Sequence, residues 1–302
     1  MKTAKMRHSF YEELTSYLLL LPYALLFAVF IAIPVALAIG LSFTFYDLIQ
    51  VPSYVGFLNY IVLMTQDEIF LRHVLPNTFI FALMVGPGGF ILSFLIAWML
   101  AQIQKVPRMF IALAVYSPTL AGGVFVSIVW RTLFSGNEQG LMNAFLIQNN
   151  FIIEPIQFLQ DPRWLLAIMI FVTLWSSMGV GFLAILAGIL NYDPEIYEAA
   201  QIDGLRNRFQ EIVYITIPTM KPQMLFGAVM AIVAAFNTGH IGVQLSGHNP
   251  TPQYAGQLIV NHIEDFALQR FELGYAAAIS VVLLIMVWLL SKVAYALFTE
   301  KG

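Results

Sequence analysis

Six long intervals of this 302-residue chain contain no Asp, Glu, Lys or Arg. Only 10% of all residues are charged and 60% are hydrophobic, whereas about a quarter of residues are charged in an average soluble domain. A helix needs roughly 20 mostly apolar residues to cross a bilayer, and an ionised side chain at its centre is costly. The chain is therefore predicted to be an all-α integral membrane protein. The uncharged intervals are residues 14–46, 74–104, 109–130, 164–192, 222–263 and 273–291.

The fifth interval, residues 222–263, is too long for one span. Its second half reads GHIGVQLSGHNPTPQYAGQ, and its many Gly, Pro and His residues favour a loop. We expect a helix over about 224–237 with about one further turn, and a loop after it. The intervals then give six transmembrane helices in a single domain, residues 1–302, because the longest loops, around 47–73 and 136–163, are short.

The positions of basic residues predict the orientation, because Lys and Arg are retained on the cytoplasmic side. The first apolar interval is longer than a secretory signal and lacks a clear cleavage site, so an uncleaved first span is expected. Both termini, and the loop between spans four and five, are then expected in the cytoplasm. Ten basic residues fall on that side, namely Lys2, Lys5, Arg7, Lys105, Arg108, Arg206, Arg208, Lys221, Lys292 and Lys301, and four on the other, namely Arg72, Arg131, Arg163 and Arg270.

Several kinds of chemistry are excluded by the residues present. The chain has no Cys, which rules out disulfides, Cys metal sites and thiol catalysis. No Lys follows a Gly, so the phosphate-binding loop of an ATPase is absent. The five His residues show no metal-ligand spacing such as HExxH. We therefore expect no enzyme activity and no cofactor in this chain.

One polar passage, YEAAQIDGLRNRFQEIVYITIP, stands between spans four and five. Asp193, Pro194 and Glu195 are typical of the first residues of a helix, and Gly204 is typical of a left-handed stop, which predicts a short helix over 194–203. A second helix is predicted from near Asn207 to Pro218. Four apolar residues fall on roughly one face of this second helix: Phe209, Ile212, Val213 and Ile217.

The first of these helices carries an acid beside two small residues. Glu198 is followed by Ala199 and Ala200, which are too small to hold a partner surface away. Such a helix suits insertion into a groove of another protein, where the carboxylate meets a basic group. A solvated cytoplasmic loop with ordinary helix caps is the alternative, and the residues alone leave both interpretations open.

The same passage resembles the EAA loop of the membrane subunits of bacterial ABC importers, which docks on the ATPase subunit. In this article residues 193–218 are called the EAA segment. It departs from the family pattern in one extra residue between Gly204 and Pro218, and in Ile217 where Leu is usual. The matching positions are Glu198, Ala199, Ala200, Asp203, Gly204, Ile215 and Pro218, and the resemblance implies that Glu198, Ala199, Ala200, Asp203, Gly204 and Arg206 couple to the ATPase.

Other stretches, in the same order as in the carbohydrate branch of that family, extend the resemblance over most of the chain. They include LPYALLFAVFIAIPVALAIGLSF, VGFLNY and SPTLAGGVFVSIVWRTLF. The resemblance implies an ABC type I importer permease fold, a bacterial plasma-membrane location and alternating access. It also implies partners: a second related permease subunit in a heterodimer, two ATPase subunits that carry ATP and Mg, and an extracytoplasmic solute-binding protein. No nucleic-acid partner is expected.

The expected solute is a sugar or oligosaccharide, and this too follows from the resemblance. A polyol, a glycerophosphodiester or another small solute is an alternative. A secondary transporter is a further alternative, although such proteins usually place ionisable groups near mid-bilayer, and none of the predicted spans contains Asp, Glu, Lys or Arg.

Two polar stretches in the spans are candidates for the solute pathway, because sugars bind through aromatic faces, amides and hydroxyls. In maltose-type relatives a Phe-Asn pair at the end of span five contacts sugar, which implies this role for Phe236 and Asn237. The other interpretations are that Trp175 packs, that Ser176 and Ser177 bond to neighbouring carbonyls, and that Asn237 bridges helices. The candidates are Trp175, Ser176, Ser177 and Gly179 in TLWSSMGVG, and Phe236, Asn237 and His240 in AAFNTGH.

Overall fold

The computed structural model describes residues 17–191, 194–205 and 207–298. Asp193 and Arg206, both named above, lie outside the described residues. Four helical segments are long and apolar enough to cross a membrane, and two bent helix pairs raise the number to as many as six if each pair is one span. The prediction of a helical membrane protein is therefore confirmed, and six spans agree with the upper count.

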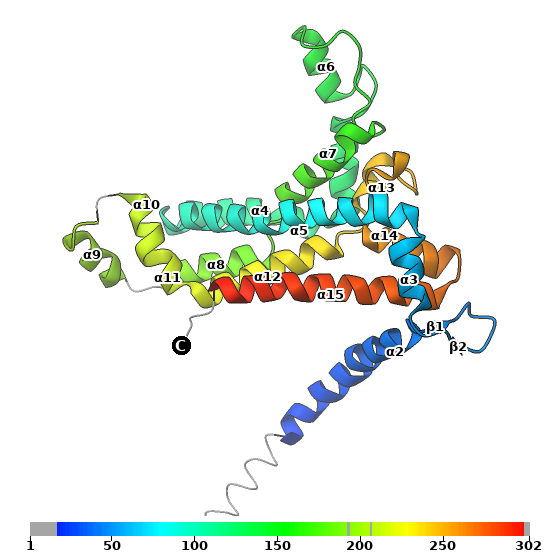
Figure 1. The fold of residues 1–302 in the computed structure, drawn as a ribbon. Helices are drawn as coiled ribbons and strands as arrows, with labels where there is room; N and C mark the ends of the chain where they lie inside the picture. The colour runs from blue at the N-terminus through cyan, green and yellow to red at the C-terminus, as the bar shows by residue number, and fades with distance from the viewer. Residues whose placement is uncertain (1–16, 192–193, 206, 299–302) are drawn as a thin grey trace, which may run out of the picture.

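The long helices lie side by side in one bundle (Figure 1). The helices α4 (Leu75–Ala101), α8 (Val180–Leu190), α12 (Lys221–Asn237) and α15 (Leu273–Phe298) form its body. One end carries α9 (Pro194–Ile202), α10 (Arg208–Glu211) and α11 (Ile217–Thr219), and is called the α9 end. The opposite end is called the α14 end and carries α3 (Leu58–Thr65), α13 (Ile241–Ser246) and α14 (Ile259–Glu264).

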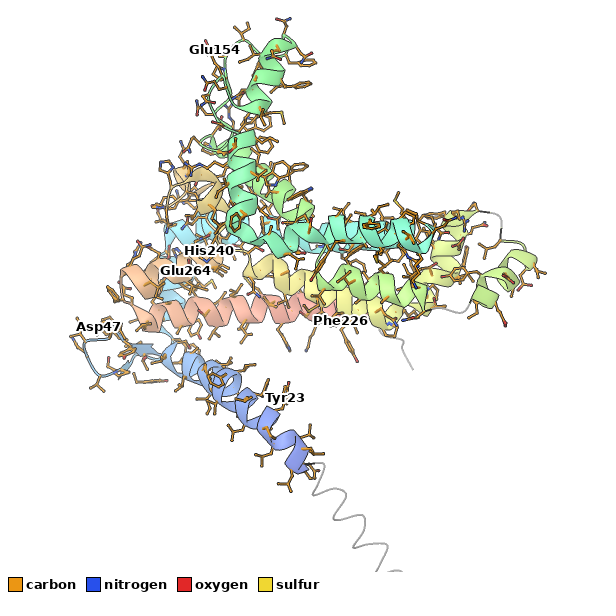
Figure 2. The ribbon with its side chains drawn as sticks, turned by 180° about the vertical axis from the view of Figure 1, so that it is seen from behind. Tyr23, Asp47, Glu154, Phe226, His240 and Glu264 are labelled. Carbon is orange, nitrogen blue, oxygen red and sulfur yellow. The ribbon has the colours of Figure 1, made fainter. Side chains whose placement is uncertain are left out.

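The first span stands apart from the bundle. Its helix, Tyr17–Leu41, has none of its most apolar window buried inside the chain. Only its last part, α2 (Ile33–Leu41), contacts α15, near the α14 end (Figures 1 and 2). A short antiparallel pair follows, β1 (Thr44–Phe45) and β2 (Ser53–Tyr54), with Thr44 opposite Tyr54. The apolar side chains of this span are therefore left for lipid or another subunit.

Three spans contain a π-turn directly before a proline. Proline has no N–H and its ring crowds the preceding turn, so a wider turn relieves the crowding. The residue before each proline then donates its N–H five residues back, as Leu75 does to the carbonyl of Phe70. The three turns are η1 (Ala28–Ala32) before Pro34, η2 (Phe70–Val74) before Pro76, and η3 (Ile212–Thr216) before Pro218.

Glycines bring two helices of the bundle into close contact. A Cβ on Gly181 of α8 would lie 3.4 Å from the Cα of Gly227 in α12. Small residues let helices approach closely in membranes, where packing rather than water drives association. Around this contact, Phe182, Ile185 and Met224 are buried in a core shared with α4.

The segment after α12 differs from the prediction of a loop. Helix α13 lies within it, because Ile241 and Leu245 are buried in the main core while the Gly- and Pro-rich residues follow after Ser246. The loop prediction was thus wrong for these six residues, and also for the residues of α14 (Ile259–Glu264) that fall within the interval. The remaining elements are α5 (Lys105–Leu133), α6 (Leu141–Gln148), α7 (Pro162–Trp175), η4 (Pro252–Tyr254) and η5 (Asp265–Gln269).

A buried hydrogen-bond cluster ties the α14 end together. The Asp67 carboxylate accepts from the Tyr275 hydroxyl at 2.9 Å and lies 2.8 Å from Nε2 of His262. It also accepts from the backbone N–H of Phe70. Burial raises the pKa of Asp67, but these hydrogen bonds outweigh it and hold the pKa below its usual range. The sequence patterns did not predict this pairing.

Candidate functional site: an uncharged cavity and a projecting loop

Three spans are interrupted beside one cavity. Helix α5 contains Gly122 in a non-helical conformation, with φ 75° and ψ 151°. The fourth span breaks between α7 and α8, with a bend of 40°. The fifth span ends at Asn237, and the chain runs through residues 238–240 into α13. Irregular backbone at membrane depth is tolerated where it is buried in protein or lines a cavity, and these three breaks line the same one.

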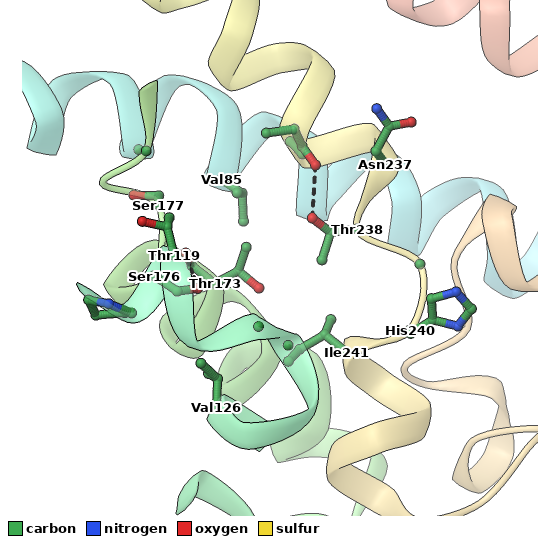
Figure 3. Close-up of a pocket in the computed structure, with 18 of the residues that line it drawn as sticks. Val85, Thr119, Val126, Thr173, Ser176, Ser177, Asn237, Thr238, His240 and Ile241 are labelled. Carbon is green, nitrogen blue, oxygen red and sulfur yellow. Dashed lines mark hydrogen bonds between the residues drawn. The ribbon is translucent and has the colours of Figure 1, made fainter. Parts of the chain in front are cut away.

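The cavity has a volume of about 470 Å³ and lies between α4, α5, α7, α12 and α13 (Figure 3). Its wall is built of small and apolar residues with a few polar groups, which is typical of binding sites for small molecules. No Asp, Glu, Lys or Arg is among the described residues that line it. The polar lining residues are Thr119, Thr173, Ser176, Ser177, Asn237, Thr238, His240 and Gln244.

Five of the seven predicted pathway residues line this cavity: Ser176, Ser177, Gly179, Asn237 and His240. The break in the fourth span places the first three there, and the end of α12 places the other two. The structure thus brings together two sequence stretches that are 58 residues apart at their nearest members, since 237 − 179 = 58. Their contact with a solute stays a prediction.

The two serines donate to their own helix. The hydroxyl of Ser177 lies 2.7 Å from the carbonyl of Leu174, and that of Ser176 lies 3.1 Å from the carbonyl of Val172. This is the alternative arrangement considered for them from the sequence. Each hydroxyl oxygen still has acceptor capacity on the cavity side.

Asn237 does not bridge helices within the described part of the chain. Its side chain is exposed at the last turn of α12, and no hydrogen bond is formed by its amide with any described residue. The neighbouring Thr238 hydroxyl instead donates to the carbonyl of Ala234 (Figure 3). A side-chain amide on a cavity wall therefore keeps both its donors and its acceptor for a ligand.

Two predicted pathway residues lie elsewhere. Trp175 is not part of the cavity wall, and its ring meets that of Trp130 edge to face, with centroids 5.3 Å apart. Phe236 is only 3% exposed and belongs to the main core. At the end of α12 the ring of Phe236 faces into the bundle while the adjacent Asn237 side chain is exposed, because successive helical residues point about 100° apart.

His240 lies close to an acidic residue of another helix. Its Nε2 lies 3.2 Å from a carboxylate oxygen of Glu264 in α14 (Figure 2). Both groups are at the α14 end of the cavity, where the histidine side chain is 58% exposed. The Glu264 carboxylate thus lies beside the His240 ring, although Glu264 is not among the described residues that line the cavity.

Sequence reasoning missed four polar lining residues: Thr119, Thr173, Thr238 and Gln244. Thr119 sits beside the break in α5, and Gln244 falls in the segment interpreted as a loop. The Thr173 hydroxyl is buried and has no hydrogen-bond partner among the described residues. A polar residue inside an apolar run is the signal that could have indicated Thr173 and Gln244.

The first helix of the EAA segment ends as predicted. Gly204 has φ 100°, and the N–H of Leu205 donates to the carbonyl of Ala200 at 3.1 Å. These features form a Schellman-type C-cap, which needs a left-handed residue after the helix. The helix runs over Pro194–Ile202, one residue shorter than predicted.

The second part of the segment begins with the side chain of Asn207 accepting from the N–H of Gln210. It continues through the π-turn η3 to Thr219, beyond the predicted end at Pro218. The apolar residues predicted to share one face differ in exposure, with Phe209 73% and Val213 38% exposed, whereas Glu211 and Thr216 are buried. An i→i+5 turn holds one residue more than an α-helical turn, which rotates the residues after it.

The tip of the segment projects beyond the bundle (Figure 1). Glu198, Ala199, Asp203 and Gly204 are all exposed, and Ile202 is 86% exposed beside them. An acidic surface with an uncovered apolar side chain is thus presented at the α9 end.

A family model for the inner membrane component of binding-protein-dependent transport systems matches residues 89–299. The probable ABC transporter permease protein YesP of Bacillus subtilis is 32% identical over 94% of this chain and 90% of its own length. The arabinooligosaccharide permease AraP of the same organism is 28% identical over 97% and 91%. The lactose permease LacF of Rhizobium radiobacter is 26% identical over 96% of each chain.

A chain from the crystal structure of a bacterial ABC transporter that imports the acidic polysaccharide alginate has a similar fold, with a TM-score of 0.76 at 26% identity. The likeness covers 98% of this chain and all of that one. The chain therefore belongs to the family of inner membrane components of binding-protein-dependent transport systems, as a multi-pass plasma-membrane permease subunit of an ABC importer.

Proposed function

We propose that this permease moves a sugar or oligosaccharide through the cavity where the three broken spans meet. The main support is the composition of the cavity wall. It presents hydroxyls and amides among small and apolar residues, with no Asp, Glu, Lys or Arg among the described lining residues. Such walls suit the hydroxyl edges of a saccharide and leave no strong site for a coupling ion. Asn237, with its unbonded amide, is the leading contact residue.

The similar proteins support a carbohydrate solute. Their names include permeases for arabinooligosaccharides, lactose and diacetylchitobiose. These names differ in the saccharide, so an experiment has to identify which saccharide this chain transports.

The EAA segment, residues 193–218, is the proposed contact with a partner ATPase. Support comes from the exposed Glu198 and Ile202 at its tip, which offer an acid and an apolar side chain together. Lys105 also begins α5 at this end of the bundle, and Arg208 and Lys221 belong to the helices next to the tip. This basic set favours a cytoplasmic α9 end and cytoplasmic termini.

We infer that the π-turn η3 accommodates the extra residue of this segment. It lies between Gly204 and Pro218, and its wider turn takes up one residue more than an α-helical turn. The second half of the segment can therefore enter α12 with Pro218 still near the bend, where the helix pair turns by 87°.

A second permease subunit is proposed to complete the pathway. The first span has none of its most apolar window buried within the chain, and the third span, Lys105–Leu133, has only 6% buried. Two ATPases and an extracytoplasmic solute-binding protein complete the proposed complex, which works by alternating access.

Reconstitution of the whole importer in proteoliposomes tests the proposal. Radiolabelled lactose, arabinotriose and diacetylchitobiose are offered with the binding protein, with ATP inside or absent. We expect uptake of at least one saccharide only with ATP. Uptake that continues without ATP while an ion gradient is kept would support a secondary transporter, and uptake of a polyol or glycerophosphodiester alone would assign the other solute class.

A further inference from the structure

The α14 end of the cavity carries a second polar group that no comparison assigns. Helix α13 places His240 and Gln244 one turn apart, and the N–H of Gln244 donates to the carbonyl of His240 at 2.9 Å. Residues four apart share one helix face. Both residues line the cavity, as does Ile241 at the edge of the core, whereas Leu245 packs entirely into the core.

Gln244 is held in place by another span. The hydroxyl of Ser127 in α5 lies 2.8 Å from Oε1 of Gln244 and 2.7 Å from the carbonyl of Gly123. Ser127 itself is 2% exposed, so its position is determined by packing. A Cβ on Gly123 would lie 3.4 Å from Oε1 of Gln244, an ordinary van der Waals distance, so the end of the Gln244 side chain lies against α5 at this residue.

The contact with Ser127 uses only one side of the Gln244 amide. Within the described residues, Nε2 of Gln244 has no hydrogen-bond partner, and the residue lies on the cavity wall. Two N–H donors are therefore left for a ligand. The single proton of the Ser127 hydroxyl is shared between Oε1 of Gln244 and the carbonyl of Gly123. This shared contact from a different span orients the carbonyl end of the amide, and with it the N–H donors, before a solute arrives.

We propose that Gln244 is a solute-contacting residue that helps to select among saccharides, and that Ser127 is its positioning residue. The inference rests on the proposed function and extends it from the end of α12 to α13. The amide donates to a hydroxyl or ring oxygen of the sugar, at the α14 end of the cavity relative to Asn237. An uncharged donor suits an uncharged edge of the saccharide, since no counter-ion lies among the described lining residues.

The test uses the complete importer in proteoliposomes with the three labelled saccharides. Gln244→Leu replaces the amide with an apolar side chain of similar volume and removes its hydrogen bonds. It should lower the uptake rate of the preferred saccharide about 10-fold, the loss of one good hydrogen bond to a solute. The ratio of uptake rates between preferred and second saccharide should fall as well. A purely structural residue would not change that ratio.

Ser127 provides the positioning test. Ser127→Ala should lower uptake about 3-fold and change the same ratio in the same direction, because the amide loses its fixed direction. Ser127→Thr keeps the hydroxyl and should retain the wild-type ratio. Gln148→Ala, at the exposed end of α6, is the matched control and should change nothing.

The possible results separate the inference from the proposed function. Wild-type rates and ratios in Gln244→Leu would overturn the inference and leave the proposed function standing. Uptake loss that only follows a smaller amount of assembled complex, with an unchanged ratio, would overturn it too. If the wild-type importer takes up no saccharide, the proposed function fails first and the inference with it.

Discussion

The EAA segment and the cavity are two polar parts of this apolar chain, and they are built in opposite ways. The first is one continuous stretch, with its exposed acid, its helix and its glycine stop within a dozen residues. The second is assembled from breaks in three spans, from Pro118 to Gln244. A local turn can be recognised from neighbouring residues, whereas a cavity exists only after helices have packed.

The two parts also differ in how exposed their side chains are. At the α9 end, side chains such as Ile202 lie fully in the open, as a docking surface requires. In the cavity two of the polar residues contact another element, Gln244 through Ser127 and His240 through Glu264. Substitutions in the first part should therefore affect coupling to ATP hydrolysis, and those in the second should affect the solute.

The largest effect is expected for Glu198→Arg. It reverses an exposed charge on α9 without touching the packing of the bundle. A like-charge contact with a basic groove is strongly unfavourable, so uptake and stimulated ATPase activity should fall more than 20-fold, or about 2 kcal/mol. ATPase assays on the assembled importer check this. Normal membrane insertion is the control, and unchanged coupling would refute the docking role.

Asn237→Ala should have the next largest effect. The amide has no partner among the described residues, so its removal costs the fold little, whereas a solute would lose one or two hydrogen bonds. Uptake should fall about 10-fold, with assembly and basal ATPase activity retained. Copurification of the subunits is measured alongside uptake. If the complex falls apart, Asn237 is a structural residue.

Gly204→Ala should reduce coupling about 5-fold, because a left-handed conformation costs an L-residue about 1 kcal/mol. No atom lies within 4 Å of the added Cβ, so the backbone alone is tested. Gly40→Ala is the matched control, since its Cβ also meets nothing and its backbone is helical. Equal behaviour of the two variants in ATP-dependent uptake would contradict the role of the stop.

The contrast between the two parts explains which features the sequence could predict. The spans follow from uncharged intervals, because lipid excludes charge strongly and over long runs. The Gly204 stop follows from local backbone sterics. The π-turns and the breaks depend on how neighbouring helices accommodate Pro and Gly, and composition does not indicate which of these residues bend a span.

The sequence also could not predict the directions of the side chains around the cavity. Phe236 and Asn237 are neighbours with the same implied role, yet one is in the core and the other is exposed. The two side chains point in different directions because successive residues of a helix are rotated by about 100°. Thr173 and Gln244 lie in different spans, and only tertiary packing brings them to the same wall.

The smallest effect on transport is expected for Asp67→Asn, which lies in neither part. It should change uptake less than about twofold but lower the free energy of unfolding by about 1–2 kcal/mol, because the largely buried carboxylate loses charge-assisted hydrogen bonds. Tyr275→Phe removes only one of them and should cost less. Thermal unfolding of the purified importer measures both.

The pH dependence of the stability lost in Asp67→Asn gives a sharper test. The folded pKa of Asp67 is lowered, so its stabilisation is present above the unfolded value of 3.8 and disappears as the pH falls through the folded value. The difference between wild type and Asp67→Asn should therefore be constant from pH 7 to about pH 5 and shrink only below about pH 4. A difference that vanished near neutral pH would mean that the Asp67 carboxylate is not the source of the stability. An uptake defect as large as that of Asn237→Ala, with the amount of assembled complex unchanged, would instead show that Asp67 takes part in transport.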